Sequence, residues 1–173
     1  MDLSFSPAEE AFRAELRSWL SANLPRETRE PETLAEEVAS LVRWQRRLFG
    51  GRWVGVHWPK EYGGRGAGVV ENYIFQEEMA RAQAPEIIGR IGVNLVGPTL
   101  IRHGTAVQKE RYLSKLLAAE DIWCQLFSEP NAGSDLTALR CKAERVGDDF
   151  VVNGQKVWTS YAQFARWGIL LAR

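Results

Sequence analysis

The first part of the chain places apolar residues at helical spacing. One stripe is formed by Phe12, Leu16, Trp19 and Leu20. The spacing i, i+4, i+7 and i+8 predicts an amphipathic helix. A capping box at Ser6-Pro-Ala-Glu9 predicts its start, and Pro25 predicts its end.

A second apolar stripe consists of Leu34, Val38, Leu41, Val42, Leu48 and Phe49, and Gly50-Gly51 follows it. This stripe predicts a second helix that ends at the two glycines, with Trp19 and Trp44 in the core.

Three further helices are predicted before residue 121. They cover Val69–Ala82, roughly Pro85–His103, and a segment opened by a second capping box at Thr105-Ala-Val-Gln108. The second of these is weakened by Gly89, Gly92, Gly97 and Pro98, and Gly104 closes it. A loop with Gly63, Gly64, Gly66 and Gly68 precedes them. Its spacing does not fit G-x-G-x-x-G and it lacks Gly-Lys-Ser/Thr, so we interpret it as a connection rather than a phosphate-binding loop.

After Asp121 the pattern changes to short apolar or alternating runs. The predicted strands are Ile122–Phe127, Cys141–Val146, Phe150–Val152, Lys156–Ser160 and Trp167–Ala172. Gly147-Asp148-Asp149 predicts a turn, and Asn153-Gly154 predicts a hairpin. Helices followed by antiparallel strands indicate an α+β fold, with a helical domain over 1–120 and a β-domain over 121–173.

The last residues, Ile169-Leu-Leu-Ala-Arg173, lie inside a predicted strand with no turn signal after them. An apolar strand edge left open there is a feature that natural proteins avoid. We therefore expect the chain to be the front part of something longer, or another chain to cover this edge.

Composition excludes several classes of protein. Among the 173 residues, 45% are hydrophobic and 25% charged, as in globular proteins. Lys plus Arg equals Asp plus Glu at 22 each, which argues against nucleic acid as the main partner. No apolar run reaches the length of a membrane span, and the N-terminus lacks the pattern of a secretory signal. The two cysteines, Cys124 and Cys141, are interpreted as reduced thiols of a cytoplasmic protein.

Metal and triad chemistry are not indicated. His57 and His103 are the only histidines, and with two distant cysteines they give no metal-ligand spacing. His103 precedes Gly104 at a predicted helix end, where a cation is favourable, so a capping role is expected. No Ser/His/Asp triad can be assembled from these residues.

Two segments of the predicted β-domain carry candidate chemistry. The run Ser128-Glu-Pro-Asn-Ala-Gly-Ser-Asp135 offers backbone amides, a glycine and hydroxyls, which suit a phosphate or pyrophosphate. An ordinary surface turn is the alternative, and both interpretations stay open. Trp158-Thr-Ser160 places an aromatic ring beside two hydroxyls, as a planar heterocycle would need. Its alternative is a tryptophan packed between sheet layers.

Four ordered motifs resemble the acyl-CoA dehydrogenase family over nearly the whole chain. They are Trp58-Pro-Lys-Glu-Tyr-Gly-Gly64, Gly97-Pro-x-Leu with His-Gly-Thr-x-x-Gln-Lys109, Ser128–Asp135, and Asn153-Gly-Gln-Lys-Val-Trp-Thr-Ser160. The run Trp123-Cys-Gln-x-Phe-Ser-Glu-Pro130 is similar to bacterial, especially actinobacterial, members, some of which act on bulky or sterol side-chain thioesters. The resemblance implies an N-terminal helical domain, a middle β-barrel-like domain that is incomplete here, and a C-terminal helical domain.

The resemblance also implies FAD as the cofactor. The implied flavin-binding residues are Gln125, Leu126, Phe127, Ser128, Gly133, Ser134, Trp158, Thr159 and Ser160. Amides near Phe127 and Ser128 would face the isoalloxazine edge, and Trp158 would wall the flavin. Ser134 would meet the pyrophosphate and the pantetheine arm of CoA. Ser160 would donate near flavin N5, the hydride acceptor.

The implied reaction is α,β-dehydrogenation of an acyl-CoA thioester, with electron-transfer flavoprotein as the electron acceptor and an oligomeric assembly. In the family a C-terminal glutamate removes the α-proton, and this chain contains no residue at that position. Glu129 is a weak candidate for the base, because its motif position is structural. The chain by itself is therefore expected to be inactive. Two alternatives stay open: a non-catalytic or half-site subunit of a heteromeric enzyme, and a flavin monooxygenase or oxidase on the same fold.

Overall fold

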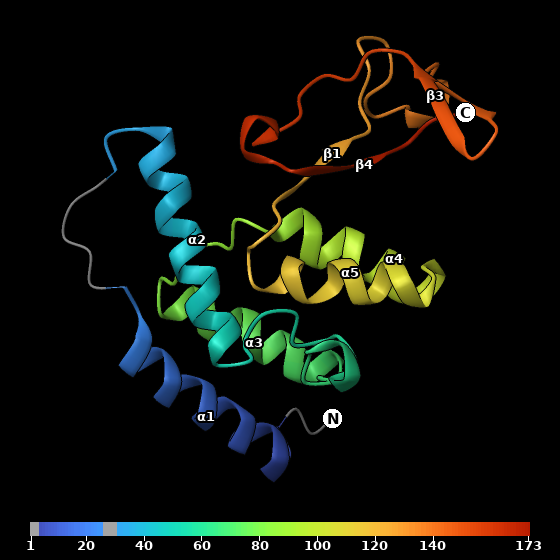
Figure 1. Ribbon diagram of the computed structural model, residues 1–173. Helices are drawn as coiled ribbons and strands as arrows, with labels where there is room; N and C mark the ends of the chain where they lie inside the picture. Colours follow the sequence, from blue (N-terminus) through green and yellow to red (C-terminus); the bar gives the residue numbers. More distant parts are fainter. Residues whose placement is uncertain (1–3, 26–30) are drawn as a thin grey trace. The chain divides into compact units, whose positions relative to one another are not determined.

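The computed structural model describes residues 4–25 and 31–173, and the chain divides into two compact units, 1–120 and 121–173. Residues 1–3, part of the N-terminus for which no secretory signal is expected, lie outside the described residues. The first unit is helical and the second carries the strands (Figure 1), which confirms the α+β class. Within the described ranges, no helix has the length and apolar content needed to cross a bilayer.

Two of the helices of the first unit begin where capping boxes predict. The helices of this unit are α1 (Pro7–Asn23), α2 (Leu34–Gly50), α3 (Val69–Arg81), α4 (Gly97–His103) and α5 (Ala106–Leu117). Ser6 Oγ accepts from Glu9 N, and Thr105 Oγ1 accepts from Gln108 N, so both capping boxes are confirmed. Helices α1 and α3 pack side by side, as do α4 and α5 (Figure 1).

The helix predicted over Pro85–His103 begins later than expected. Helical structure starts at Arg90 and passes through one π-helical turn, Gly92–Val96, before α4. A residue far away in the sequence determines where this helix begins, because Gly89 N donates to the side chain of Gln45 at 2.7 Å. Gly89 O then accepts from Val93 N at 2.8 Å, which starts the helical hydrogen bonding.

A single buried glutamine ties three helical segments together. Gln45, on α2, is fully buried and its Nε2 donates to Leu116 O at 3.0 Å and to Leu117 O at 3.1 Å. These are carbonyls of the last turn of α5, which have no donor within their own helix. Trp44 is in the core as predicted, whereas Trp19 is only half-buried.

Trp58 and Gly97, from two separate motifs, meet in the same core. Gly97 N donates to Gly92 O, and Pro98 has no N–H, so Val93 O has no donor within the helix. The indole Nε1 of Trp58 fills this position, donating to Val93 O at 3.0 Å. Gly97 permits the approach, because a Cβ there would lie 1.9 Å from Trp58 Cζ2. The two motifs are therefore one packing unit.

The strands of the second unit pair in two different ways. They are β1 (Trp123–Leu126), β2 (Lys142–Val146), β3 (Asp149–Asn153) and β4 (Trp167–Leu170). The β2–β3 pair is antiparallel and turns at Gly147-Asp148 as predicted, with Gly147 at φ +64°. The β1–β4 pair is parallel, which the antiparallel expectation did not include. Parallel pairing is allowed here because the long connection through the β2–β3 hairpin serves as the crossover.

Two local predictions in this unit were wrong. Asn153-Gly154 is not a hairpin turn: β3 ends at Asn153, and Gly154 lies against Cys141, where a Cβ would be 2.7 Å from Cys141 Sγ. The segment predicted as a strand over Lys156–Ser160 has no strand structure. Trp158 has φ +58°, a left-handed conformation that breaks a strand ladder.

The open apolar surface of the β-unit lies on the hairpin. The exposed apolar side chains there are Val146, Phe150, Val151 and Val152. The segment Ile169–Leu171, where an open edge was expected, is half-buried. Backbone pairing continues beyond β4, since Leu171 N donates to Leu126 O at 3.2 Å and Arg173 N donates to Cys141 O at 2.8 Å.

Candidate flavin-binding site and a cavity in the helical unit

The run that follows β1 presents backbone amides that the protein itself does not use. The N–H groups of Phe127, Ser128, Gly133 and Ser134 donate to no acceptor within the described residues. Glu129 N and Ala132 O, 2.8 Å apart, close a tight turn between these two pairs. A Cβ built at Gly133 would meet no atom within 4 Å, so the space beside this turn is open. Unused amides beside open space are suited to a ligand rich in acceptor oxygens.

The two motif segments of the β-unit are hydrogen-bonded to each other. Val157 N donates to Ser128 O at 2.9 Å. Lys156 Nζ donates to Phe127 O at 2.9 Å and to Glu129 Oε1 at 2.8 Å. The structure thus brings Phe127–Ser128 together with Lys156–Val157, the two residues just before Trp158, although the sequence separates them by 29 residues.

Glu129 is a structural anchor of this site. Besides Lys156, its carboxylate accepts from Arg140 N at 2.6 Å and from Cys141 N at 2.9 Å. The Lys156 hydrogen bond and then the Arg140 amide lower the pKa of the Glu129 carboxyl to about 2. A carboxylate that is this acidic and already accepts three donors is poorly suited to remove a proton. Glu129 therefore does not replace the catalytic base of the family.

Trp158 stands out from the protein surface. Its side chain is 90% exposed, so the alternative of a tryptophan packed between sheet layers was wrong. Its left-handed backbone is rare for a large residue, and such outliers gather at functional sites. The backbone just before Trp158 is fixed by the hydrogen bond from Val157 N to Ser128 O. An exposed indole on a fixed backbone is a suitable wall for a planar ligand.

The remaining predicted flavin residues occupy different surroundings. Gln125 and Leu126 end β1 and are half-buried, and Leu126 contacts the backbone at Gly168. Ser134 and Ser160 are exposed. Thr159 is half-buried, and its carbonyl accepts from Ala162 N at 3.3 Å. The hydrogen bonds of the structure link the two motif segments only through residues 127–129 and 156–157.

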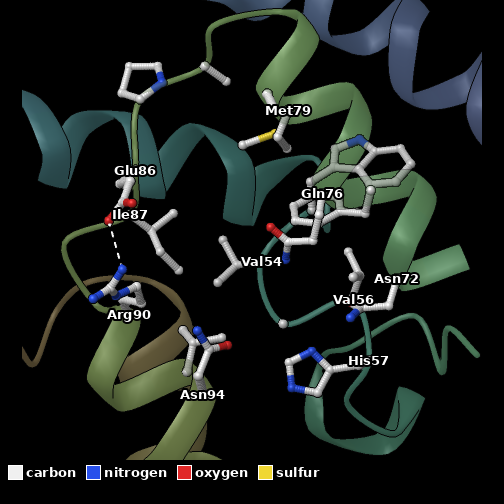
Figure 2. A pocket seen from close by; sticks show the side chains of 17 residues that line it. Val54, Val56, His57, Asn72, Gln76, Met79, Glu86, Ile87, Arg90 and Asn94 are labelled. Atoms are coloured by element: carbon white, nitrogen blue, oxygen red, sulfur yellow. Dashed lines mark hydrogen bonds and ion pairs between the residues drawn. The ribbon is translucent and has the colours of Figure 1, made fainter. Parts of the chain in front are cut away.

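The helical unit contains a cavity of about 370 Å³ that the sequence did not reveal. Its apolar lining includes Val54, Val56, Phe75, Met79 and Ile87. Its polar lining includes His57, Asn72, Gln76 and Asn94, and Figure 2 shows Gln76, Asn94 and His57 around the same hollow. The lining comes from a loop, from α3 and from residues 84–94, so no local pattern marks it.

The cavity has a mixed apolar and polar lining that carries no net charge. Arg90 is paired with Glu86 at 3.4 Å. His57 is exposed as a residue, yet desolvation of its ring lowers the pKa below the ordinary 6.5, so the imidazole is neutral at pH 7. Asn72 Oδ1 is buried and has no hydrogen-bond donor within the described residues. These groups favour an uncharged, mainly apolar ligand that carries a few hydrogen-bonding groups.

Metal chemistry gains no support. Within residues 4–25 and 31–173, no group of three His, Cys, Asp or Glu side chains could hold a metal ion. His103 lies in the last turn of α4, as its expected capping role requires. Cys124 and Cys141 are both free and buried.

Comparisons with known proteins agree with these motifs. Residues 6–120 match the acyl-CoA dehydrogenase N-terminal domain, and residues 124–173 match the acyl-CoA dehydrogenase middle domain. The chain belongs to the acyl-CoA dehydrogenase family. It is 42% identical over 174 aligned residues to acyl-CoA dehydrogenase IpdE1 of Mycobacterium tuberculosis, covering 95% of this chain and 44% of that protein. It is 38% identical to acyl-CoA dehydrogenase FadE26 of the same organism, covering 100% and 44%.

Solved structures give the same family. The ChsE4–ChsE5 complex from Mycobacterium tuberculosis matches with a TM-score of 0.82 and 37% identity, covering 100% of this chain and 44% of that one. The Tcur3481–Tcur3483 steroid ACAD matches with a TM-score of 0.77 and 36% identity, covering 100% and 45%. The chain thus spans less than half the length of these relatives. The expected likeness to actinobacterial members is confirmed by the mycobacterial relatives.

Proposed function

We propose that this chain supplies the flavin-facing segments of a FAD-dependent acyl-CoA dehydrogenase. The observation that carries the proposal is the hydrogen-bonded junction between residues 127–129 and 156–157. It holds four unused amides and an exposed indole on two motifs that the family shares. FAD, when bound, supplies the acceptor for the hydride that leaves the β-carbon of the acyl group.

The residues of this chain fit the parts of FAD in different ways. The amides of Phe127 and Ser128 are donors for the oxygen and nitrogen edge of the isoalloxazine. The open turn at Gly133 and Ser134 is suited to the pyrophosphate, and Ser134 is also the proposed contact for the pantetheine arm of CoA. Trp158 and Thr159 flank the ring, and the Ser160 hydroxyl is the proposed donor near N5.

The cavity of the helical unit supports a bulky, apolar acyl group. Its uncharged lining disfavours an acyl group that ends in a carboxylate, because the one arginine is paired with Glu86. Its amides and neutral imidazole can pair with hydroxyl or keto oxygens. The similarity to the Tcur3481–Tcur3483 steroid ACAD favours the same substrate class. We therefore propose a steroid-type acyl-CoA rather than a short straight-chain one.

A heteromeric enzyme is the proposed assembly. The motif Ser128–Asp135 carries two carboxylates: Glu129 is held by three donors, and Asp135 Oδ1 accepts from its neighbour Thr137 Oγ1. Two of the solved relatives pair two named proteins, ChsE4–ChsE5 and Tcur3481–Tcur3483. The catalytic carboxylate is proposed to come from a segment or partner subunit outside these residues. Electron-transfer flavoprotein is the proposed acceptor, and the free thiols suit a reducing cytoplasm.

Anaerobic stopped-flow mixing tests this function. The holoprotein, meaning this chain with the segment or subunit that completes its site, is mixed with a steroid side-chain acyl-CoA and, separately, with octanoyl-CoA. Loss of the visible flavin absorbance is expected with both, and it should be faster with the steroid thioester. No bleaching with any acyl-CoA would reject the dehydrogenase. Equal rates with both thioesters would reject the proposed substrate class.

A further inference from the structure

Lys156 controls the direction of one peptide group in the candidate flavin site. In a trans peptide the C=O and the following N–H point in opposite directions. Lys156 Nζ donates to Phe127 O at 2.9 Å, on one side of the peptide that joins Phe127 to Ser128. The Ser128 N–H therefore points to the other side, where no acceptor within the described residues receives it.

The two flanking peptides are held by backbone groups instead. Leu171 N donates to Leu126 O at 3.2 Å, which orients the Phe127 N–H. Val157 N donates to Ser128 O at 2.9 Å. Among the carbonyls of residues 126, 127 and 128, only that of Phe127 accepts its hydrogen bond from a side chain. Replacing Lys156 therefore removes the side-chain hydrogen bond that orients this backbone.

The side chain of Lys156 is buried, so its charged ammonium group loses the favourable interaction with water. This side chain is 7% exposed and that of its partner Glu129 is 8% exposed. Replacing a buried ion pair by apolar groups is often neutral for stability, whereas neutralising or removing one partner alone destabilises the fold. Glu129 balances the ammonium charge, and Arg140 N and Cys141 N hold Glu129 in place. The pair fixes geometry while adding no net charge beside the amides.

We propose that Lys156 is a positioning residue for the flavin: it aims the Ser128 N–H at the isoalloxazine edge, and Glu129 holds it there. This inference rests on the proposed function, since it needs FAD to bind beside Ser128. Without Lys156, the Ser128 N–H is no longer directed at the flavin edge, which then loses one hydrogen-bond donor. FAD affinity should then fall by about tenfold to a hundredfold, the range for one hydrogen bond to a buried partner. The electron-rich reduced flavin loses most from a missing donor, so the flavin midpoint potential should become more negative.

The test compares three variants of the holoprotein with the wild type. Lys156→Met removes the ammonium and keeps a long, unbranched side chain. Lys142→Met is the matched control, because Lys142 lies exposed on β2. The double variant Lys156→Met with Glu129→Gln removes both charges and separates the loss of aim from the loss of charge balance. The readouts are the Kd for FAD after flavin removal and the flavin midpoint potential.

We expect weaker FAD binding and a more negative midpoint potential in Lys156→Met and in the double variant. In Lys142→Met, the Kd for FAD should stay within about twofold of wild type. Wild-type values in a folded Lys156→Met would overturn the inference. Wild-type values in the double variant would also overturn it, because charge balance alone would then explain the single variant. If Lys156→Met fails to fold, the double variant, which leaves no unpaired charge, decides. A wild-type holoprotein that cannot bind FAD would instead refute the proposed function.

Discussion

The contact between Trp58 and Gly97 gives a quantitative test of how the helical unit is built. Trp58→Phe removes the donor that Val93 O has among the described residues, and it also removes the outer part of the indole. A buried carbonyl left without a donor costs about 1–3 kcal/mol. The void left by the smaller ring adds roughly 1 kcal/mol, well below the 3–5 kcal/mol of a full truncation to alanine. The expected loss is therefore about 2–4 kcal/mol.

Gly97→Ala acts on the same contact from the other side. The new methyl would lie 1.9 Å from Trp58 Cζ2 and 2.2 Å from Cη2, so the ring or the helix must move. Overpacking of this kind costs about 1–3 kcal/mol. In the double variant the phenyl ring lacks the atoms that the methyl meets, and the methyl fills part of the void. The two losses should therefore fall short of additivity by about 1–2 kcal/mol.

Native-state hydrogen exchange of the α4 and α5 amides measures these losses within the holoprotein, because it reports the opening free energy of each segment. Val69→Ala is the control, since Val69 is 89% exposed at the start of α3 and should change the opening free energy by less than about 0.5 kcal/mol. Losses that add within about 0.5 kcal/mol in the double variant would refute the contact as described.

Three further outcomes are expected. Gln45→Met should lower the opening free energy of α5 by about 2 kcal/mol or more, because Leu117 O and Gly89 N lose their partner, whereas Leu116 O keeps a long hydrogen bond from Ala119 N at 3.4 Å; an unchanged exchange rate would contradict this. The lowered pKa of Glu129 stabilises the β-unit above pH 4.5, and that stability should be lost as pH falls from 4.5 toward 2. Urea unfolding against pH should show this loss in the wild type and not in Glu129→Gln. Ser160→Ala should fold normally yet slow flavin reduction in stopped-flow mixing; an unchanged rate would remove Ser160 from the hydride-acceptor site.

The features that the sequence predicted well are formed by residues that are close together along the chain. The capping boxes at Ser6 and Thr105 involve residues three positions apart, so the starts of α1 and α5 could be placed correctly. The start of helical structure at Arg90 could not, because Gln45, far away in sequence, takes the Gly89 amide. No local pattern indicates that partnership.

In the candidate flavin site, too, local features were predicted and long-range contacts were not. The resemblance to a family predicted which motif residues face the flavin, and this stays a prediction, but it did not predict the hydrogen bonds that connect the two motifs. Lys156–Ser160 has the composition of a strand, and its hydrogen bonds instead go to Phe127 and Ser128. The cavity escaped prediction for a related reason. Its polar residues, such as Asn72 and Asn94, lie on different segments and look like ordinary surface positions.

FAD titration of the flavin-free holoprotein, with wild type and Trp158→Leu side by side, tests the central claim most directly. Trp158 is 90% exposed, so its replacement should leave the unfolding free energy unchanged. Stacking on an aromatic ring contributes about 1–3 kcal/mol, so FAD affinity should fall by roughly tenfold or more. Phe150→Leu, on the exposed hairpin, is the control and should bind like wild type. The account predicts a yellow wild-type protein and a stable variant with weakened FAD binding. A wild type that takes up no FAD, or a Trp158→Leu variant that binds FAD equally well, would contradict it.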